Sequence, residues 1–249
     1  MKNQEVIFVW GVCPRSGTTL VQRLLASGGI FAYGEEMQLT QIDLQSIRYF
    51  SKDTPHHQYR QRFLDGEYNF WSPGVLPKQE RMLKGLRDIF YKRVSIFVED
   101  AKSEGFDRIA LKEPTLMIDN FMSINKLLPN SKHIICNRNL EDIIKSAKAR
   151  QFIVNEQNFI QYCQIWQNNI EHLGSLEKMN NVLVFNYDGD REKETGKLAK
   201  WLDIKVDKGI LKHKINTFGG DAEKGLSDTG YIEPIELSKE EKEMVKRYV

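Results

Sequence analysis

A short loop near the N-terminus carries the residue types from which proteins build phosphate-binding sites. Residues 13–19 read CPRSGTT, and a glycine stands at position 11 before them. In a loop of this composition, successive backbone N–H groups point into one concavity at a helix N-terminus, where they have no intrahelical partner and the helix dipole favours an anion. We therefore predict that the loop holds a phosphate or sulfate ester through Arg15, Ser16, Gly17, Thr18 and Thr19.

The loop departs from the Walker A pattern of nucleotide kinases. That pattern ends in Gly-Lys-Ser/Thr, whereas Gly17 is followed here by two threonines and the nearest cation is Arg15. A magnesium-dependent phosphoryl transferase also needs a carboxylate for its metal, and no apolar segment of the sequence ends in an obvious one. A P-loop nucleotide-dependent kinase or phosphotransferase is thus the alternative function, and a tight strand–helix turn without a ligand is the structural alternative.

The elements that must position this loop alternate between strands and helices. Apolar runs predict strands at residues 6–10, 30–33, 108–112, 133–136 and 182–185. Apolar residues at helical spacing predict helices that begin at Thr18 and after Asn139 and that cover residues 37–50, 78–102, 115–128, 156–178 and 193–202. This alternation predicts an α/β fold with a central parallel sheet flanked by helices. We find no linker, so residues 1–249 are predicted to form a single domain.

The composition narrows the class of protein. The chain has 36 Lys and Arg against 34 Asp and Glu, a formal net charge of +2, which gives no footprint of nucleic-acid or anionic-membrane binding. We see no signal peptide and no apolar run long enough to span a membrane. The three cysteines, at positions 13, 136 and 163, are scattered and suggest neither a disulfide framework nor a zinc site. A reduced, cytoplasmic, soluble protein is expected.

Basic side chains follow three of the predicted strands at the point where each strand ends. In open α/β sheets, ligands bind outside the carboxyl ends of the strands, so the loop around Arg15 should meet Lys112 and Arg138 there. Arg138 offers a planar fork for phosphate oxygens. Ser146 and Arg150, four residues apart on the next predicted helix, share one face of it. The alternative is a set of solvated surface charges on a basic helix face.

At this point the motifs carry a family resemblance. PRSGTT after a strand resembles the 5′-phosphosulfate loop of sulfotransferases that use 3′-phosphoadenosine-5′-phosphosulfate (PAPS), and GVCPRSGTTL followed by GEE most resembles the tyrosylprotein sulfotransferase branch. The resemblance implies a P-loop-like three-layer fold and transfer of a sulfuryl group from PAPS to an acceptor hydroxyl without a metal. The acceptor it implies would be a tyrosine of a peptide or protein, or a small alcohol, phenol or sugar. A soluble chain would depart from the membrane-anchored, Golgi-resident members of that branch.

The resemblance assigns a general base to the GEE string. Its second glutamate, Glu36, occupies the place of the branch's catalytic glutamate, and a carboxylate there would accept the proton of the acceptor hydroxyl. Glu35 is the local rival, and the alternative for both glutamates is the acidic first turn of a helix. Cytosolic small-molecule sulfotransferases use a histidine base, a part that His56 or His57 would have to play here.

The remaining roles follow from the same resemblance. Lys112, in LKEP, resembles the lysine of the branch's NKDP string and would neutralise the leaving 5′-phosphate together with Arg15. The pair Arg138 and Ser146, eight residues apart, matches the pair that holds the 3′-phosphate of the donor, with Arg150 as a further basic residue.

Two further positions are matched less closely. Tyr187 resembles a tyrosine near the nucleotide, and Ser227, in GLSDTGYIEP, a serine that contacts the transferring group. The branch's lysine before the proline of that string is Glu233 here. Residues 51–77 are expected to lie over the site and to shape the acceptor pocket. For the whole chain, a non-catalytic module that binds a nucleotide is a further alternative function.

Overall fold

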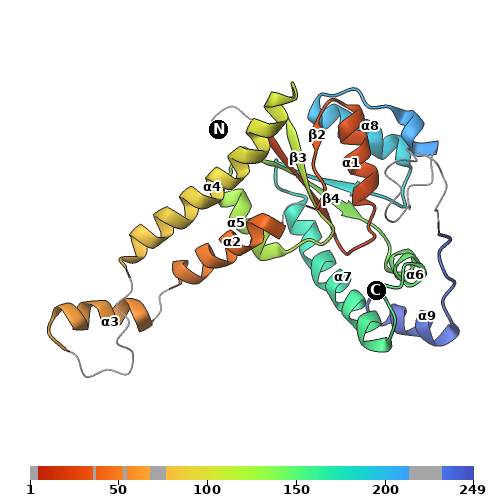
Figure 1. Ribbon diagram of the computed structural model, residues 1–249. Coiled ribbons are helices and arrows are strands. Elements are labelled where there is room, and N and C mark those ends of the chain that lie inside the picture. The colour runs from red at the N-terminus through yellow and green to blue at the C-terminus, as the bar shows by residue number, and fades with distance from the viewer. Residues whose placement is uncertain (1–4, 36–37, 53–54, 68–76, 213–231) are drawn as a thin grey trace.

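Five parallel strands form one sheet at the centre of the computed structural model, which describes residues 5–35, 38–52, 55–67, 77–212 and 232–249 (Figure 1). The strands lie in the order β2-β3-β1-β4-β5. Their bounds are β1 Val6–Gly11, β2 Phe31–Ala32, β3 Ile109–Glu113, β4 Lys132–Asn137 and β5 Val182–Asn186. Because β3 and β4 flank β1 on opposite sides, the carboxyl end of β1 is a topological switch point, where ligands of such sheets bind.

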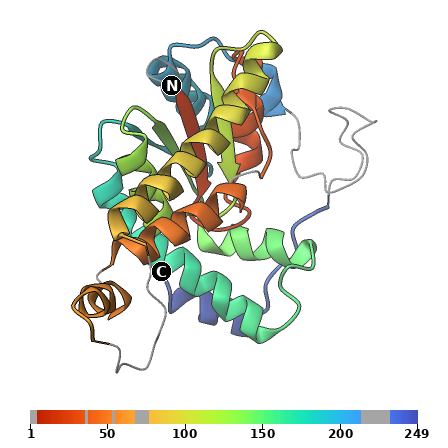
Figure 2. The ribbon, with the colours of Figure 1, turned by 60° about the vertical axis from the view of Figure 1, so that its left-hand side comes forward.

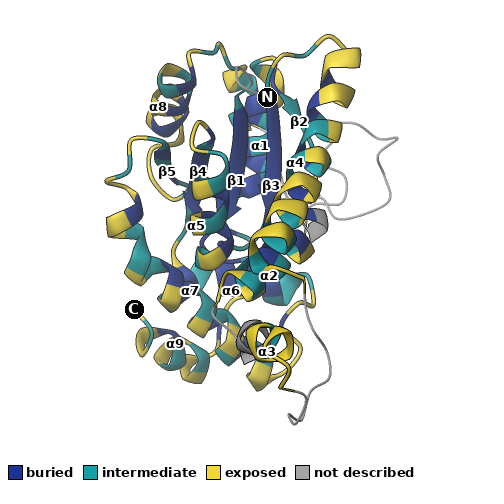
Figure 3. Cartoon of the chain, turned by 90° about the vertical axis from the view of Figure 1, so that its left-hand side faces the viewer, coloured by how far each residue is buried: buried dark blue, intermediate teal, exposed yellow. Residues whose placement is uncertain are grey.

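The central strands are buried on both faces, as continuous apolar runs require. In β1, Ile7 and Val9 face one layer of helices while Phe8 and Trp10 face the other. Figure 3 shows β1, β3 and β4 as a dark, buried core between helices whose outer sides are exposed. The predicted α/β fold with a parallel central sheet flanked by helices is confirmed.

The helices form the two outer layers. One cluster of buried side chains joins α1 and α8 to one face of the sheet, and the other joins α2, α4, α5, α6 and α7 to the opposite face. The helix bounds are α1 Thr18–Ser27, α2 Gln38–Ser51, α3 Pro55–Leu64, α4 Gln79–Ser103, α5 Ile118–Leu127, α6 Leu140–Ala149, α7 Glu156–Leu176, α8 Arg191–Leu202, the 3₁₀ helix η1 Lys208–Lys212 and α9 Lys239–Lys246.

The position of helix α3 differs from the expectation that residues 51–77 lie over the site. Helices α2 and α4 run side by side, joined by an ion pair between Arg93 Nε and Asp43 Oδ2 at 2.7 Å. Gln79 ties their outer ends together by donating to the carbonyl oxygen of Phe50 at 2.6 Å. Helix α3 connects these outer ends, so it lies away from α6 in both views (Figures 1 and 2). Residues 53–54 and 68–76 lie outside the described residues.

Local capping contacts fix the starts of two helices, α6 and α9. The helix predicted to begin after Asn139 is confirmed as α6, and Asn139 caps it, because its side-chain oxygen accepts from the N–H of Asp142 at 2.8 Å. We predicted no element for residues 239–246, where the structure has α9. Its start is fixed by a capping box in which Ser238 and Glu241 satisfy each other's backbone N–H groups.

Two structural features bear on the class of protein. Across the described ranges, no helix is both long enough and apolar enough to cross a bilayer. All three cysteines are buried and free.

Candidate functional site

The loop between β1 and α1 is built by its own side chains and by close neighbours. Ser16 is fully buried, and its hydroxyl donates to the carbonyl oxygen of Cys13 at 2.6 Å and accepts from the N–H of Cys13 at 3.1 Å. A Cβ at Gly17, where φ is +96°, would overlap the ring of Tyr187. Arg15 also has a positive φ, of 80°, a strained conformation that concentrates at functional sites. The two hydrogen bonds between Ser16 and Cys13 thus stabilise this loop conformation.

The start of α1 offers backbone N–H groups to a ligand. Gly17 is the N-cap residue of α1, and no side chain in the described part of the chain caps this end. The first N–H groups of a helix have no intrahelical acceptor, and the dipole adds partial positive charge there. Thr18 and Thr19 form the first turn of α1, with Thr18 buried and Thr19 partly buried. The structure thus places the predicted anion loop at the switch point of the sheet.

Helix α7 contacts the loop between β1 and α1 at two points. The sequence did not indicate these contacts. Asn169 is buried and donates to the carbonyl oxygen of Val12 at 2.8 Å. The thiol of Cys13 lies 3.7 Å from the carbonyl oxygen of Tyr162. Both contacts join residues far apart in the sequence, and no motif around Tyr162 or Asn169 signals them.

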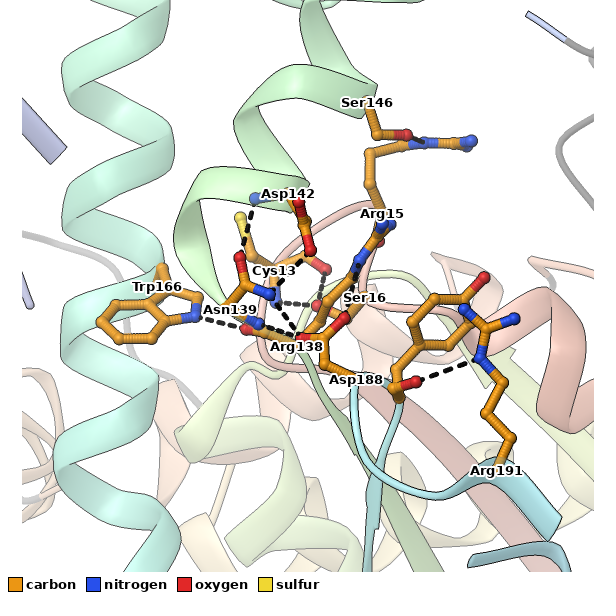
Figure 4. Close-up of polar contacts among 11 residues, drawn as sticks. Cys13, Arg15, Ser16, Arg138, Asn139, Asp142, Ser146, Trp166, Asp188 and Arg191 are labelled. Carbon is orange, nitrogen blue, oxygen red and sulfur yellow. Dashed lines mark hydrogen bonds and ion pairs between the residues drawn. The ribbon is translucent and has the colours of Figure 1, made fainter. Parts of the chain in front are cut away.

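Arg15 of the loop lies close to Arg138 and to Ser146 of α6 (Figure 4). Arg15 Nε donates to Ser146 Oγ at 3.3 Å, and Arg138 Nη1 donates to the carbonyl oxygen of Arg15 at 3.0 Å. Burial lowers the pKa of Arg15, and the charges of Arg150 and Arg138 lower that pKa further. Three like charges in one partly buried place favour the binding of an anion there.

Arg138 is held on several sides. Its Nε lies 3.6 Å from Asp188 Oδ1, and its carbonyl oxygen accepts from Trp166 Nε1 at 2.8 Å. Its guanidinium lies 4.7 Å from the centre of the Tyr187 ring, and that of Arg191 lies 4.4 Å from the same ring. Tyr187 therefore braces Arg138 as well as covering the loop. The sequence pointed to Arg138 and Tyr187 but gave no signal for Asp188 or Trp166.

Lys112 reaches the same edge of the sheet from β3. Its side chain is only 10% exposed, and its Nζ lies 3.4 Å from Glu35 Oε1. Burial raises the pKa of the Cys136 thiol on β4, and the Lys112 charge opposes that rise. Because β3 and β4 lie on opposite sides of β1, the charge of Lys112 acts across the carboxyl end of β1, where the loop begins.

The remaining predicted positions differ in what the structure describes of them. Glu36, the predicted base, and Ser227 lie outside the described residues. Glu35 is placed against Lys112. Nothing is described of the side chains of His56 and His57, whose helix α3 lies away from α6. Ser146 is buried one turn before Arg150, which ends α6.

Comparisons with known proteins bear on the family and the fold of this chain. Residues 6–208 match the model of a family described as the sulfotransferase family. The fold is similar to a sulfotransferase domain from an olefin synthase of Synechococcus PCC 7002, with a TM-score of 0.54 and 16% identity over 98% of this chain and 94% of that one. It is also similar to a sulfotransferase domain from the curacin biosynthetic pathway, with a TM-score of 0.52 and 14% identity over 97% and 96%. No curated protein gives a significant match by sequence.

Proposed function

We propose, from the premise that this chain belongs to the sulfotransferase family, that it transfers a sulfuryl group from PAPS to the hydroxyl group of an acceptor. The observation that carries the choice of donor is the convergence of Arg15, Arg138 and Ser146 beside the loop after β1. The loop suits a 5′-phosphosulfate, and the guanidinium groups suit a second, separate phosphate. PAPS carries both anions.

The second phosphate is assigned to Arg138, Ser146 and Arg150. A phosphate oxygen placed between Arg138 and Ser146 would accept charge-assisted hydrogen bonds, the stronger kind. It would also offset the repulsion that lowers the pKa of Arg15. Asp188, which pairs with Arg138, fixes the orientation of the guanidinium fork. The proposal therefore gives Arg138 the selection of the 3′-phosphate.

Sulfuryl transfer itself is assigned to Arg15 and Lys112. In the proposed step, the acceptor oxygen bonds to sulfur as the bond from sulfur to the bridging oxygen of the 5′-phosphate breaks. Negative charge grows on that bridging oxygen, and preorganised cations oppose it. Lys112 lies at the end of β3 beside the loop, and Arg15 lies within the loop. The products are the sulfate ester of the acceptor and 3′-phosphoadenosine-5′-phosphate (PAP). A sulfuryl ester carries one charge less than a phosphoryl group, so this step is proposed to need no metal.

The proton of the acceptor hydroxyl is assigned to Glu36, with Ser227 as a further contact of the transferring group. Replacing Glu36 with Gln should lower turnover by about 10² or more, the scale of general-base catalysis, and leave PAP affinity nearly unchanged. Rates of product formation and calorimetry with PAP give the two values. A variant that keeps more than about a tenth of the wild-type rate would contradict this role, since proton transfer to a positioned base contributes about 10²–10⁴-fold.

A direct assay separates sulfuryl from phosphoryl transfer. PAPS with labelled sulfur is incubated with the protein in EDTA, with a tyrosine peptide, p-nitrophenol and N-acetylglucosamine as acceptors. Transfer of the label to each acceptor and release of PAP are both followed. The resemblance to the tyrosylprotein branch makes the peptide one candidate acceptor. Metal-free PAP release from PAPS supports the proposal. Release of ADP from ATP that requires magnesium, without use of PAPS, would replace it with the kinase alternative.

A further inference from the structure

A pocket opens on the side of the loop away from α1. It has a volume of about 690 Å³, within the usual range for small-molecule sites. Helix α2, the segment after β3 and helix α7 line it, and we call it the α2–α7 pocket. Its described lining comprises Gln41, Ile42, Gln45, Glu113, Thr115, Leu116, Met117, Ile165, Asn168 and Asn169.

Three lining residues of the pocket adjoin Lys112 or the loop after β1, to which sulfuryl transfer is assigned. Glu113 follows Lys112 directly at the end of β3, and their side chains face opposite layers of the sheet. Asn169, another lining residue, donates to the carbonyl oxygen of Val12 in the loop. Leu116 also donates its N–H to the carbonyl oxygen of Gly11 at 2.6 Å. A molecule in this pocket would therefore lie beside the loop, across the end of β1 from α1.

Glu113 is the ionisable residue of the described lining. It is 5% exposed, and its Oε2 accepts from Gln41 Nε2 at 3.0 Å. The N–H of Thr115 also hydrogen-bonds to its carboxyl group. Burial raises the pKa of Glu113 to about 7, the charge of Glu35 adds to the rise, and the charge of Lys112 opposes it. Near neutral pH this carboxyl can therefore donate as well as accept a hydrogen bond.

We propose that the α2–α7 pocket binds the acceptor, that Glu113 hydrogen-bonds to it there, and that the acceptor is a small uncharged polyhydroxy compound such as a monosaccharide. This inference rests on the proposed function. Gln41, Gln45, Asn168 and Asn169 each carry an amide that both donates and accepts, which matches several hydroxyl groups.

The charge and shape of the lining narrow the class of acceptor. The described lining holds no lysine or arginine, so an anionic acceptor would meet the carboxyl of Glu113 without a compensating cation. It also holds no aromatic ring on which a phenol could stack. Ile42 and Ile165 instead offer aliphatic surface for the C–H groups of a sugar ring. An acidic tyrosine peptide is thus a poor fit to the lining.

Methyl spectroscopy of the PAP-loaded protein tests this site even while the natural acceptor is unidentified. With ¹³C-labelled isoleucine and methionine methyls, Ile42, Ile165 and Met117 report on the pocket, and Ile89 and Ile96, exposed on α4, report on unspecific binding. The probes are N-acetylglucosamine, which is uncharged, and glucose 6-phosphate, which is an anion of similar size. We expect saturable shifts at the three pocket methyls with N-acetylglucosamine and at least tenfold weaker binding of glucose 6-phosphate.

Variants at Glu113 separate recognition from folding. E113Q keeps the size and hydrogen bonding of the side chain and should bind N-acetylglucosamine within about threefold of wild type, whereas E113L should lose about tenfold, the scale of one hydrogen bond. E99Q and E99L, on the exposed face of α4, are the matched controls and should bind as wild type does. PAP affinity should be the same in all five proteins, which verifies their fold.

The outcomes distinguish the two proposals. A wild-type protein that does not bind PAP overturns the proposed function and this inference with it. Normal PAP binding without shifts at Ile42, Ile165 and Met117, or with equal shifts at Ile89 and Ile96, overturns the pocket assignment alone. Equal binding of the two sugars overturns the class of acceptor, and equal binding by E113L and wild type overturns the role of Glu113.

Discussion

Strand β4 carries two polar centres whose surroundings differ. Near its start, the ring of His133 is fully buried in the sheet–helix interface. Trp10 Nε1 donates to His133 Nδ1 at 3.2 Å, and Ser131 Oγ lies 3.0 Å from His133 Nε2. The ring also stacks on Phe8, with centroids 5.3 Å apart. Both ring nitrogens have partners, and burial lowers the pKa of His133 to about 3, so the ring stays neutral.

The other centre lies just past the end of the same strand. Arg138 follows β4 directly and meets Arg15 from the loop after β1. Here like charges are packed together, and they lower the pKa of Arg15 in addition to burial. A neutral, satisfied histidine supports the fold, whereas gathered guanidinium groups favour a ligand that brings negative charge. The comparison separates a polar residue whose partners are all within the protein from a cluster of like charges that would be stabilised by an anionic ligand.

The largest expected effect is a loss of stability when the packing around His133 is disrupted. Phe121, on α5, is fully buried, and its ring centroid lies 4.6 Å from that of His133. Replacing Phe121 with Ala should lower the free energy of unfolding by about 3–5 kcal/mol, since it leaves a cavity in the core. Urea denaturation measures this loss. PAP affinity of the folded variant should be unchanged, and a comparable loss of PAP affinity would show that the two centres are coupled.

A pH comparison sharpens the contrast between buried groups. Glu113 has a pKa raised from 4.5 to about 7, so the folded protein binds more protons than the unfolded chain in that interval. Its contribution to stability is therefore lost as the pH rises from 4.5 to about 7, by at most about 3 kcal/mol. His133, whose pKa is lowered from 6.5 to about 3, acts in the opposite sense, and its contribution is lost as the pH falls from 6.5 to about 3.

Urea denaturation of wild type and E113Q at pH 5 and pH 8 measures the Glu113 effect. The stability of E113Q relative to wild type should be higher at pH 8 than at pH 5, because the variant cannot ionise. His133 is present in both proteins and cancels in the difference. An equal difference at the two pH values would show that Glu113 does not titrate in this interval.

The arginine centre should respond in the opposite way to the His133 centre. Replacing Arg138 with Ala should weaken PAP binding by roughly 1.5–3 kcal/mol, the scale of a charge-assisted hydrogen bond. The free energy of unfolding without ligand should change little. Arg191→Ala is the control, because Arg191 lies over the same Tyr187 ring but is exposed. If both variants lose the same affinity, general positive charge rather than the Arg138 fork attracts the ligand.

The smallest expected effect concerns the helix that carries Ser146. Asn139 caps α6 by accepting from the N–H of Asp142. Its replacement with Ala should cost about 1 kcal/mol of unfolding free energy and alter PAP affinity less than Arg138→Ala does. Thermal denaturation and calorimetry give the two numbers. A larger loss of PAP affinity than for Arg138→Ala would mean that the position of α6 outweighs the arginine.

The sequence allowed the sheet, the loop and the start of α6 to be predicted because their signals are local. Apolar runs identified the strands, and the glycine-bounded loop after residues 6–10 led us to predict an anion site there, which stays a prediction. The capping box at Ser238 and Glu241 was an available local signal for α9 that we did not use. The single domain and the roles of the site residues stay predictions.

The remaining features depend on tertiary contacts that no local pattern carries. Asn169 contacts Val12, which lies 157 positions away in the sequence, and Asp188 comes close to Arg138 only because β4 and β5 pair. The position of α3 was predicted wrongly because the pairing of α2 with α4, and not the sequence of α3, sets it. The burial of Glu113 likewise depends on α2 and α7 closing over the end of β3.

Calorimetry in EDTA with PAP and with AMP, which lacks the 3′-phosphate, tests the central claim most directly. ADP and ATP, with and without magnesium, are the controls. The account predicts metal-free PAP binding at micromolar or tighter affinity, at least tenfold tighter than AMP, with the advantage over AMP lost in Arg138→Ala. Equal binding of PAP and AMP, or a magnesium-dependent preference for ATP, would contradict the assignment of the arginine centre to the 3′-phosphate.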